Sequence, residues 1–248
     1  VFSLPTFLYV NENRKISVKK KNLISNSFRK LKNTFKSVRK YKELTKFLIA
    51  RLFYNDGLIT VFAFGGIYAA GTFGFEIDEI IIFAIVLNIT AGIGAFLMGF
   101  LDDIIGGKQT IQISNIGLII ACLIVVFAPN RDLFSMTLPV MGVTVISGKT
   151  LFWLSGILIG IFSGPNQASS RSLMARFIPD GKESEFFGFF AFSGKATAFL
   201  GPFFLGLFTQ LYSSQRYGIA VVLFLLVIGS VLLRSVNEEL GIEAAQSQ

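Results

Sequence analysis

The chain has 248 residues, of which 52% are apolar, 14% aromatic and only 15% charged. A soluble domain would carry about 25% charged residues and a disordered chain would not contain 28 Phe, so the composition indicates a membrane protein. The net charge of +8 is uneven, because residues 11–46 hold 13 basic and two acidic residues, a net charge of +11, which leaves −3 for the rest. This pattern favours an anionic lipid surface over nucleic acid as the partner of the basic segment.

Two predicted elements precede the apolar part of the chain. Residues 1–10 are apolar but too short to cross a bilayer, so we expect them to be the end of a truncated transmembrane helix in a longer protein. Residues 11–46 are predicted as a basic cytoplasmic loop. Within it, apolar residues at helical spacing, opposite Lys and Arg, predict an amphipathic helix lying on anionic lipid; a solvated linker is the alternative. The apolar positions are Ile24, Phe28, Leu31, Phe35, Val38 and Tyr41.

Six apolar runs follow, each close to the ~20 residues that a helix needs to cross the hydrocarbon core. They predict transmembrane helices at residues 47–70, 80–100, 110–128, 151–175, 186–208 and 217–234. Residues 133–148 are shorter and contain Pro139 and Gly142, so we predict a loop there rather than a seventh span. The expected fold class is an all-α membrane protein, with a six-helix transmembrane bundle at 47–234 and a cytoplasmic tail at 235–248.

Lys and Arg are concentrated in the connections on one side of this predicted bundle. With residues 11–46 in the cytoplasm, the inner connections also hold Lys108, Arg176, Lys182 and Arg234, and the outer ones hold Arg131, Lys149 and Arg216. The predicted topology therefore places both ends in the cytoplasm. The richness in Lys, Ile, Asn and Phe is typical of an AT-biased bacterial genome, so a bacterial inner membrane is the expected location.

Several motifs carry a family resemblance. Between the second and third predicted spans, the frame Gly99-x-x-x-Asp103-x-x-Gly106-x-Lys108 resembles the loop signature of the major facilitator superfamily, whose transporters have twelve helices in two six-helix halves. Three further stretches are similar to the branch that contains the autophagy-related vacuolar amino-acid effluxers and their bacterial relatives. These stretches are RLFYNDG from Arg51, GPNQASSRS from Gly164, and EFFG from Glu185 with SGK at 193–195.

The resemblance implies that the chain is the C-terminal half of a twelve-helix transporter and includes helices seven to twelve. It implies a missing N-terminal six-helix half as partner, and transport of a small solute such as an amino acid by alternating access. It also implies a conformational gate at one end of the bundle. The residues that it assigns to this gate are Gly99, Asp103, Gly106, Lys108 and Arg171.

Three ionisable residues fall within the predicted spans, where a charge is costly and is therefore a functional candidate. Counted from the cytoplasmic ends of their helices, Asp56 and Lys195 both lie ~13 Å deep. Arg51 and Asn55 share one helix face, and Asp56 and Thr60 share a neighbouring face. Two roles are open for Asp56: it changes protonation or partner during transport, or it forms a static ion pair with Lys195 or Arg51.

Uncharged polar residues complete the candidate site. Asn166 and Gln167 follow Gly164 and Pro165, which can bend the fourth span, and Asn88 lies in the middle of the second. Each either lines a solute path or packs helices together by hydrogen bonding. The substrate and coupling candidates are therefore Arg51, Asn55, Asp56, Asn88, Asn166, Gln167 and Lys195.

Enzymatic chemistry is disfavoured by the residue types that the sequence lacks. There is no histidine, Cys122 is the single cysteine, and Asp102 and Asp103 are expected to be a solvated loop pair. We therefore expect no metal, no cofactor and no catalytic residues. An accessory or structural membrane subunit and, less favoured, an intramembrane enzyme are the alternatives to a transporter.

Overall fold

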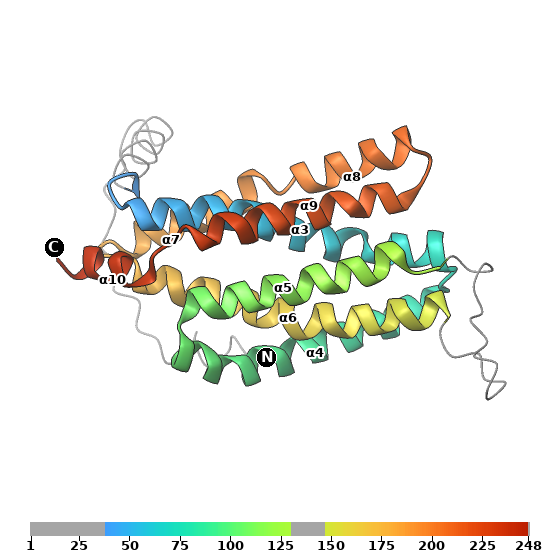
Figure 1. The fold of residues 1–248 in the computed structure, drawn as a ribbon, viewed down its shortest axis with the longest axis horizontal. Coiled ribbons are helices and arrows are strands. Elements are labelled where there is room, and N and C mark those ends of the chain that lie inside the picture. The colour runs from blue at the N-terminus through green and yellow to red at the C-terminus, as the bar shows by residue number, and fades with distance from the viewer. Residues whose placement is uncertain (1–37, 130–146, 248) are drawn as a thin grey trace, which may run out of the picture. The chain divides into compact units, whose positions relative to one another are not determined.

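The computed structural model describes residues 38–129 and 147–247, and these form helices joined by short connections (Figure 1). The predicted helix end at 1–10, most of the predicted interfacial helix and nearly all of the predicted loop at 133–148 lie outside the described residues. The helices are α3 (Lys42–Phe73), α4 (Ile77–Ile105), α5 (Gly107–Phe127), α6 (Gly148–Arg176), α7 (Glu183–Ala196), α8 (Leu200–Leu211), α9 (Gln215–Arg234) and α10 (Glu238–Gln246).

Five candidate membrane spans are present in the described part of the chain: α3, α4, α5, the combined segment Glu183–Leu211, and α9. Helix α6 is not among them, although its 29 residues extend over ~43 Å at 1.5 Å per residue. Its second half is more polar than the other spans, because Asn166, Gln167 and Arg171 follow Pro165. Helix α6 nevertheless packs along α4 and α5 and completes the predicted bundle.

The helices form two groups that lie side by side (Figure 1). In one group α3 and α8 pack on α9, and in the other α4 and α5 pack on α6; α5 also contacts α9 and so joins the groups. The buried core contains large side chains from both groups, including Tyr54, Phe73, Leu118 and Leu226. Burial of such side chains against neighbouring helices sets the rotation of each helix about its axis.

The predicted fifth span is interrupted in the structure. Glu183–Leu211 is a candidate membrane span, as predicted, but α7 ends at Ala196 and α8 begins at Leu200, so the span is not one continuous helix. Pro202 explains the break, because it has no N–H and its ring would clash with the carbonyl of Ala198 one turn earlier in a continuous helix. The span is therefore two half-helices in line, a feature that membrane transporters use at binding sites.

Helices α4 and α6 approach each other along a stripe of glycines. A Cβ atom at Gly94 would collide with the backbone carbonyl of Ile161, and one at Gly164 would collide with the carbonyl of Ala91. Pro165 lacks the N–H that would bond the Ile161 carbonyl, so this carbonyl is free to meet α4. Gly94 and Gly164 therefore allow the backbones of α4 and α6 to approach closely.

Helices α5 and α6 run antiparallel, with matching ends. Ser155 donates a hydrogen bond to the Ala121 carbonyl at 2.9 Å, and Gly148 lies against the Pro129 carbonyl. The chain therefore leaves α5 and enters α6 at the same end of the bundle. The predicted six-span arrangement requires this; a seventh span between them would have placed Pro129 and Gly148 at opposite ends.

Candidate functional site

A chain of buried hydrogen bonds crosses the core between α3, α5 and α6. Asn166 donates to the Asn115 side-chain oxygen at 2.8 Å, and Ser170, whose Oγ donates to the Asn166 carbonyl, lies 2.8 Å from the Tyr54 hydroxyl. All four residues are at most 3% exposed. Asn166 was predicted either to line a path or to pack helices, and its burial favours packing.

The buried hydrogen bonds that link Asn115, Asn166, Ser170 and Tyr54, here called the polar relay, lead to a stability prediction. Asn166→Ala should lower the free energy of unfolding by about 1 kcal/mol, since it leaves the Asn115 side chain without its partner in a membrane helix interface. Asn88→Ala is the matched control, because the exposed Asn88 side chain donates only to the Ala84 carbonyl of its own helix. Thermal unfolding of the purified protein in detergent measures both, and equal losses would contradict the role of the relay.

Arg51 and Asn55 both reach across to α7, as their predicted shared face requires. The Arg51 guanidinium lies over the Phe190 ring, 3.5 Å from its centroid, and Nη1 donates to the Phe190 carbonyl at 3.2 Å. Asn55 donates to the Gly194 carbonyl at 3.4 Å. Gly194 has no side chain between the helices, and a Cβ there would lie 2.9 Å from Arg51 Nη1. Arg51 is thus held in one orientation while most of its donors remain available.

Asp56 points to α8, on the neighbouring face of α3. Its Oδ2 accepts a hydrogen bond from the Gly201 backbone N–H at 3.1 Å, and its Oδ1 is buried with no hydrogen-bond partner among the described residues. The predicted static ion pairs are wrong: among the described residues Asp56 forms no salt bridge with Lys195 or Arg51, and the Lys195 side chain is exposed. The partner of Asp56 is instead the first turn of a half-helix.

Six candidate residues are exposed on the described bundle: Asn88, Gly99, Asp103, Gln167, Arg171 and Lys195. Asn88 and Gln167 lie level with each other along the α4–α6 seam, because the Gly94–Ile161 and Ala91–Gly164 contacts define the same antiparallel register. Lys195 is 12 residues into α7, or ~18 Å by the helical rise. Polar side chains at this depth need water or another protein segment rather than lipid.

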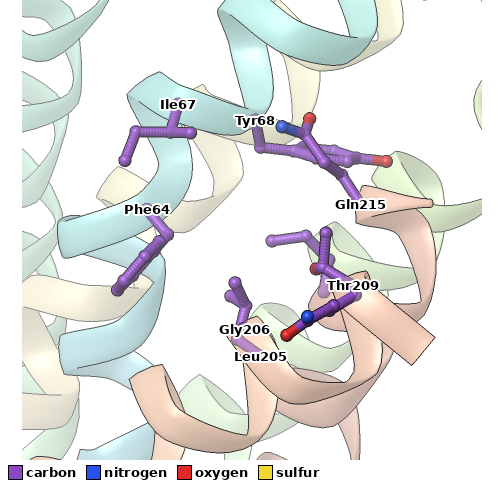
Figure 2. A pocket seen from close by; sticks show the side chains of 9 residues that line it. Phe64, Ile67, Tyr68, Leu205, Gly206, Thr209 and Gln215 are labelled. Atoms are coloured by element: carbon purple, nitrogen blue, oxygen red, sulfur yellow. The ribbon is translucent and has the colours of Figure 1, made fainter. Parts of the chain in front are cut away.

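A separate cavity of about 270 Å³ lies between α3, α8 and α9 (Figure 2). Its wall is mainly apolar, with Tyr68, Thr209, Gln210 and Gln215 as polar residues. No prediction from the sequence pointed to it, because it depends on how α8 diverges from α3. The lining residues are Phe64, Ile67, Tyr68, Leu205, Gly206, Thr209, Gln210, Gln215 and Ile219.

At one end of the bundle, Glu238 at the start of α10 joins three helices. Its carboxylate accepts hydrogen bonds from the backbone N–H groups of Gly107 and Lys108 at 3.1 and 2.9 Å, at the first turn of α5. It also accepts from Arg176 of α6 at 3.1 Å, and Arg176 pairs with Asp102 of α4 at 3.3 Å. An anion at a helix N-terminus is favourable, so Glu238 closes this end of the bundle.

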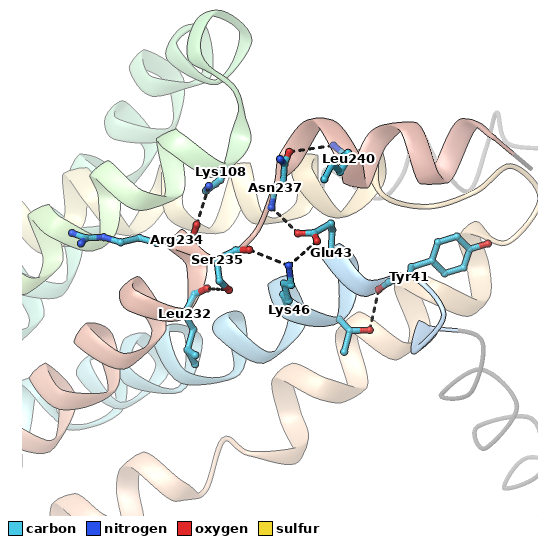
Figure 3. A network of polar contacts seen from close by, with 10 residues as sticks. Tyr41, Glu43, Lys46, Lys108, Leu232, Arg234, Ser235, Asn237 and Leu240 are labelled. Carbon is cyan, nitrogen blue, oxygen red and sulfur yellow. Dashed lines mark hydrogen bonds and ion pairs between the residues drawn. The ribbon is translucent and has the colours of Figure 1, made fainter.

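A second set of contacts ties the same end to α3 (Figure 3). Glu43 accepts from the Asn237 backbone N–H at 2.7 Å and from Lys46 at 2.7 Å, and Lys46 donates to the Ser235 carbonyl at 3.2 Å. Lys108 donates to the Arg234 carbonyl at 3.2 Å. The segment predicted as a tail therefore contains a helix that is docked on the bundle.

These contacts correct the predicted chemistry of the gate loop. Asp102 is buried and ion-paired, so the prediction of a solvated Asp102–Asp103 pair was wrong, and Asp103 is the exposed member. The basic partner at this end is Arg176 rather than Arg171, which is exposed. Gly106 has φ +90°, a backbone conformation that favours glycine, and it brings the α5 N-terminus to Glu238.

A family model and the similar proteins of known sequence point to the same family. The family model described as "Vacuole effluxer Atg22 like" matches residues 1–246. The uncharacterized MFS-type transporter YxiO of Bacillus subtilis is 28% identical over 248 residues, which are 100% of this chain and 53% of that protein. Autophagy-related protein 22 of Cryptococcus neoformans is 27% identical over 207 residues, 83% of this chain and 36% of that protein. No solved structure matches. The chain thus spans about half the length of YxiO and less of the fungal protein.

Proposed function

Since the chain belongs to the family of vacuole effluxer Atg22-like proteins, we propose that the protein of which it forms about half is a secondary transporter that moves a small solute by alternating access. The described helices form one lobe of a major facilitator fold. A second six-helix lobe is the proposed partner. The exposed polar residues at membrane depth support this, because the side chains of Asn88, Gln167 and Lys195 lie outside the core of their own bundle and need water or another protein segment rather than lipid.

The solute that best fits this lobe carries a carboxylate, as an amino acid does. Arg51, Arg171 and Lys195 lie on α3, α6 and α7, and in the described part of the chain none of them forms an ion pair with an acidic side chain. Arg51 is the most ordered of the three, because Phe190 holds its guanidinium plane. A fixed guanidinium with free N–H groups binds a carboxylate through charge-assisted hydrogen bonds. The fixed orientation of the Arg51 guanidinium over the Phe190 ring is the observation on which the proposal rests.

The proposed orientation places the α10 end in the cytoplasm of a bacterial inner membrane. Basic residues at that end, including Lys42, Lys46, Lys108 and Arg234, support it. At the remote end, Lys149 is paired with Glu79 at 2.8 Å and adds little net charge. Anionic lipid headgroups are the proposed surface for the basic segment at residues 11–46.

Uptake by the full-length protein in proteoliposomes tests the function. We expect labelled amino acids to be taken up, and Arg51→Gln to lower uptake roughly tenfold, the effect of losing one charge-assisted hydrogen bond. Arg234→Gln, an exposed arginine at the bundle end, is the control and should keep wild-type uptake. Amines that lack the carboxylate should be poor substrates for the wild type.

Two outcomes would contradict the proposal. Equal uptake of the amino acid and its decarboxylated amine would exclude the assigned role of Arg51. No uptake of any solute by a folded full-length protein would favour the alternative of an accessory membrane subunit.

A further inference from the structure

We propose that Asp56 is a reversible proton-binding site that controls the α7–α8 break, so that proton uptake at its carboxylate is coupled to movement of α8. The inference rests on the proposed transport function for its consequence, but the site itself stands on the geometry around Asp56. Its ligand is a proton that enters from one aqueous side and leaves to the other.

The Asp56 carboxylate is buried deep in the bundle and has few polar neighbours. Asp56 is 14 residues from the start of the 32-residue helix α3 and is only 2% exposed. Within residues 38–129 and 147–247, its Oδ2 has one donor, the Gly201 N–H, and its Oδ1 has none. A carboxylate buried in this way with a single hydrogen bond is unfavourable while it is charged, and the bare Oδ1 offers a position for a proton.

The helices around Asp56 bring few charged groups near its carboxylate. On α3 the nearest charge is Arg51, whose guanidinium is held by Phe190, and on α7 it is the exposed Lys195. Helix α8 contains no charged residue. Where α9 packs beside Asp56, it presents Val222, Leu225 and Leu226 to the adjacent Gly57. In the described part of the chain, no cation lies within ion-pairing distance of the Asp56 carboxylate. A bound proton is therefore needed to neutralise it.

The oxygen atoms around Asp56 favour a proton over a metal ion as the ligand. The described residues contain no group of three or more His, Cys, Asp or Glu side chains that could hold one. The Thr60 hydroxyl beside Asp56 donates to the Asp56 carbonyl at 2.7 Å, so it is oriented within α3. A sodium ion would need several oxygen ligands from around Oδ1, whereas a proton needs only the oxygen itself.

The contact with Gly201 links the proton to α8. The charged carboxylate binds the N-terminal turn of α8 through a charge-assisted hydrogen bond and through the helix dipole. Addition of a proton at Oδ1 gives a neutral carboxylic acid, whose Oδ2 is a weaker acceptor for the Gly201 N–H. The chain between the half-helices is held by few backbone hydrogen bonds, such as Leu200 N–H to the Thr197 carbonyl at 2.8 Å. Loss of the charge therefore frees α8 to pivot at residues 197–199.

Gly201 makes this contact specific. A Cβ at residue 201 would collide with the Thr60 hydroxyl and lie 3.2 Å from the Asp56 carbonyl oxygen. The absence of a side chain brings the α8 backbone within hydrogen-bond reach of Asp56. Protonation and movement therefore act on the same close contact between α3 and α8.

The experiment compares wild type, Asp56→Asn, Asp56→Glu and the exposed control Glu239→Gln in the full-length protein. Proteoliposomes are assayed for amino-acid accumulation driven by an imposed pH gradient, and for counterflow at equal pH, which needs no driving force. We expect Asp56→Asn to lose about tenfold of the gradient-driven accumulation, the size of a typical coupling between two sites, while it retains counterflow. Asp56→Glu should retain part of the gradient response, and Glu239→Gln all of it.

A second measurement does not require a solute. Infrared difference spectra between alkaline and acid pH should show a protonated-carboxyl band in the wild type that is missing in Asp56→Asn. Protection of the first turn of α8 against hydrogen exchange, corrected for the intrinsic rate at each pH, should fall on acidification in the wild type and be independent of pH in Asp56→Asn. Failure of all transport with these signals intact would refute the proposed transporter function but support the proton site.

Three results would overturn the inference. These are gradient-driven accumulation that persists in Asp56→Asn, accumulation that depends on sodium and not on protons, and a wild-type infrared spectrum without the Asp56 band. The Asn variant has the size of aspartate and a neutral acceptor for the Gly201 N–H, so it should resemble the protonated wild type, and its counterflow reports whether it is folded.

Discussion

Gly94→Val is expected to prevent α4 from packing on α6, with a loss of about 3 kcal/mol or more in the free energy of unfolding. The new side chain would meet the Ile161 carbonyl, and the Ile161 Cα and carbonyl carbon lie within 2.8 Å of the Cβ position. These are backbone atoms of a long helix, so they cannot move aside as a flexible side chain would. We expect a large fall in the yield of monodisperse protein and in its melting temperature.

Gly92→Val is the matched control for this change. Gly92 lies on the same helix two residues earlier, is exposed, and has no atom within 4 Å of its Cβ position. The two variants add the same atoms to α4, so the difference between them isolates the contact with α6. Equal melting temperatures in size-exclusion-purified samples would show that this glycine is not required for the packing.

Arg176→Gln is expected to open the α10 end of the bundle. It removes the partner of Asp102, whose side chain is 10% exposed, and one of the donors to Glu238. Leaving a buried carboxylate unpaired costs about 2 kcal/mol once the partial exposure of Arg176 is taken into account. Amide hydrogen exchange at Gly107 and Lys108, which donate to Glu238, should become faster.

The control for this prediction is Arg234→Gln, in which an exposed arginine at the same end of the bundle is neutralised. Its side chain has no ion pair with the described acidic residues, so exchange at the first turn of α5 should stay as in the wild type. If both variants accelerate exchange equally, net charge rather than the Arg176 contacts holds this end closed.

The positions of the membrane helices were predictable because apolar length is a local property. A backbone without water must bond internally, so each run of about 20 apolar residues becomes a helix whatever its neighbours are. The spans predicted at residues 80–100 and 217–234 correspond to the helices Ile77–Ile105 and Gln215–Arg234. The helices extend past the predicted ends because charged and polar residues outside the hydrocarbon core continue the helical hydrogen bonding.

The partners of the candidate residues were less predictable. Spacing placed Arg51 with Asn55 and Asp56 with Thr60 on neighbouring faces of α3, and the structure has both pairs on those faces. Matching depth, however, did not make Asp56 and Lys195 partners. Depth specifies only the level along the membrane normal, whereas contact also needs the rotation of both helices, and α7 turns Lys195 outward.

The amino-acid sequence by itself determined the lipid-spanning helices, their alternating direction and the family resemblance, since these follow from composition, length and short motifs. Only the tertiary structure decided that Asp102 and not Asp103 is buried, that Arg176 and Glu238 join α4, α5, α6 and α10, and that Asp56 meets a half-helix. The physical reason is that such contacts depend on how closely helices approach. Glycines without side chains and prolines without an N–H set that distance through atoms from segments far apart in the chain.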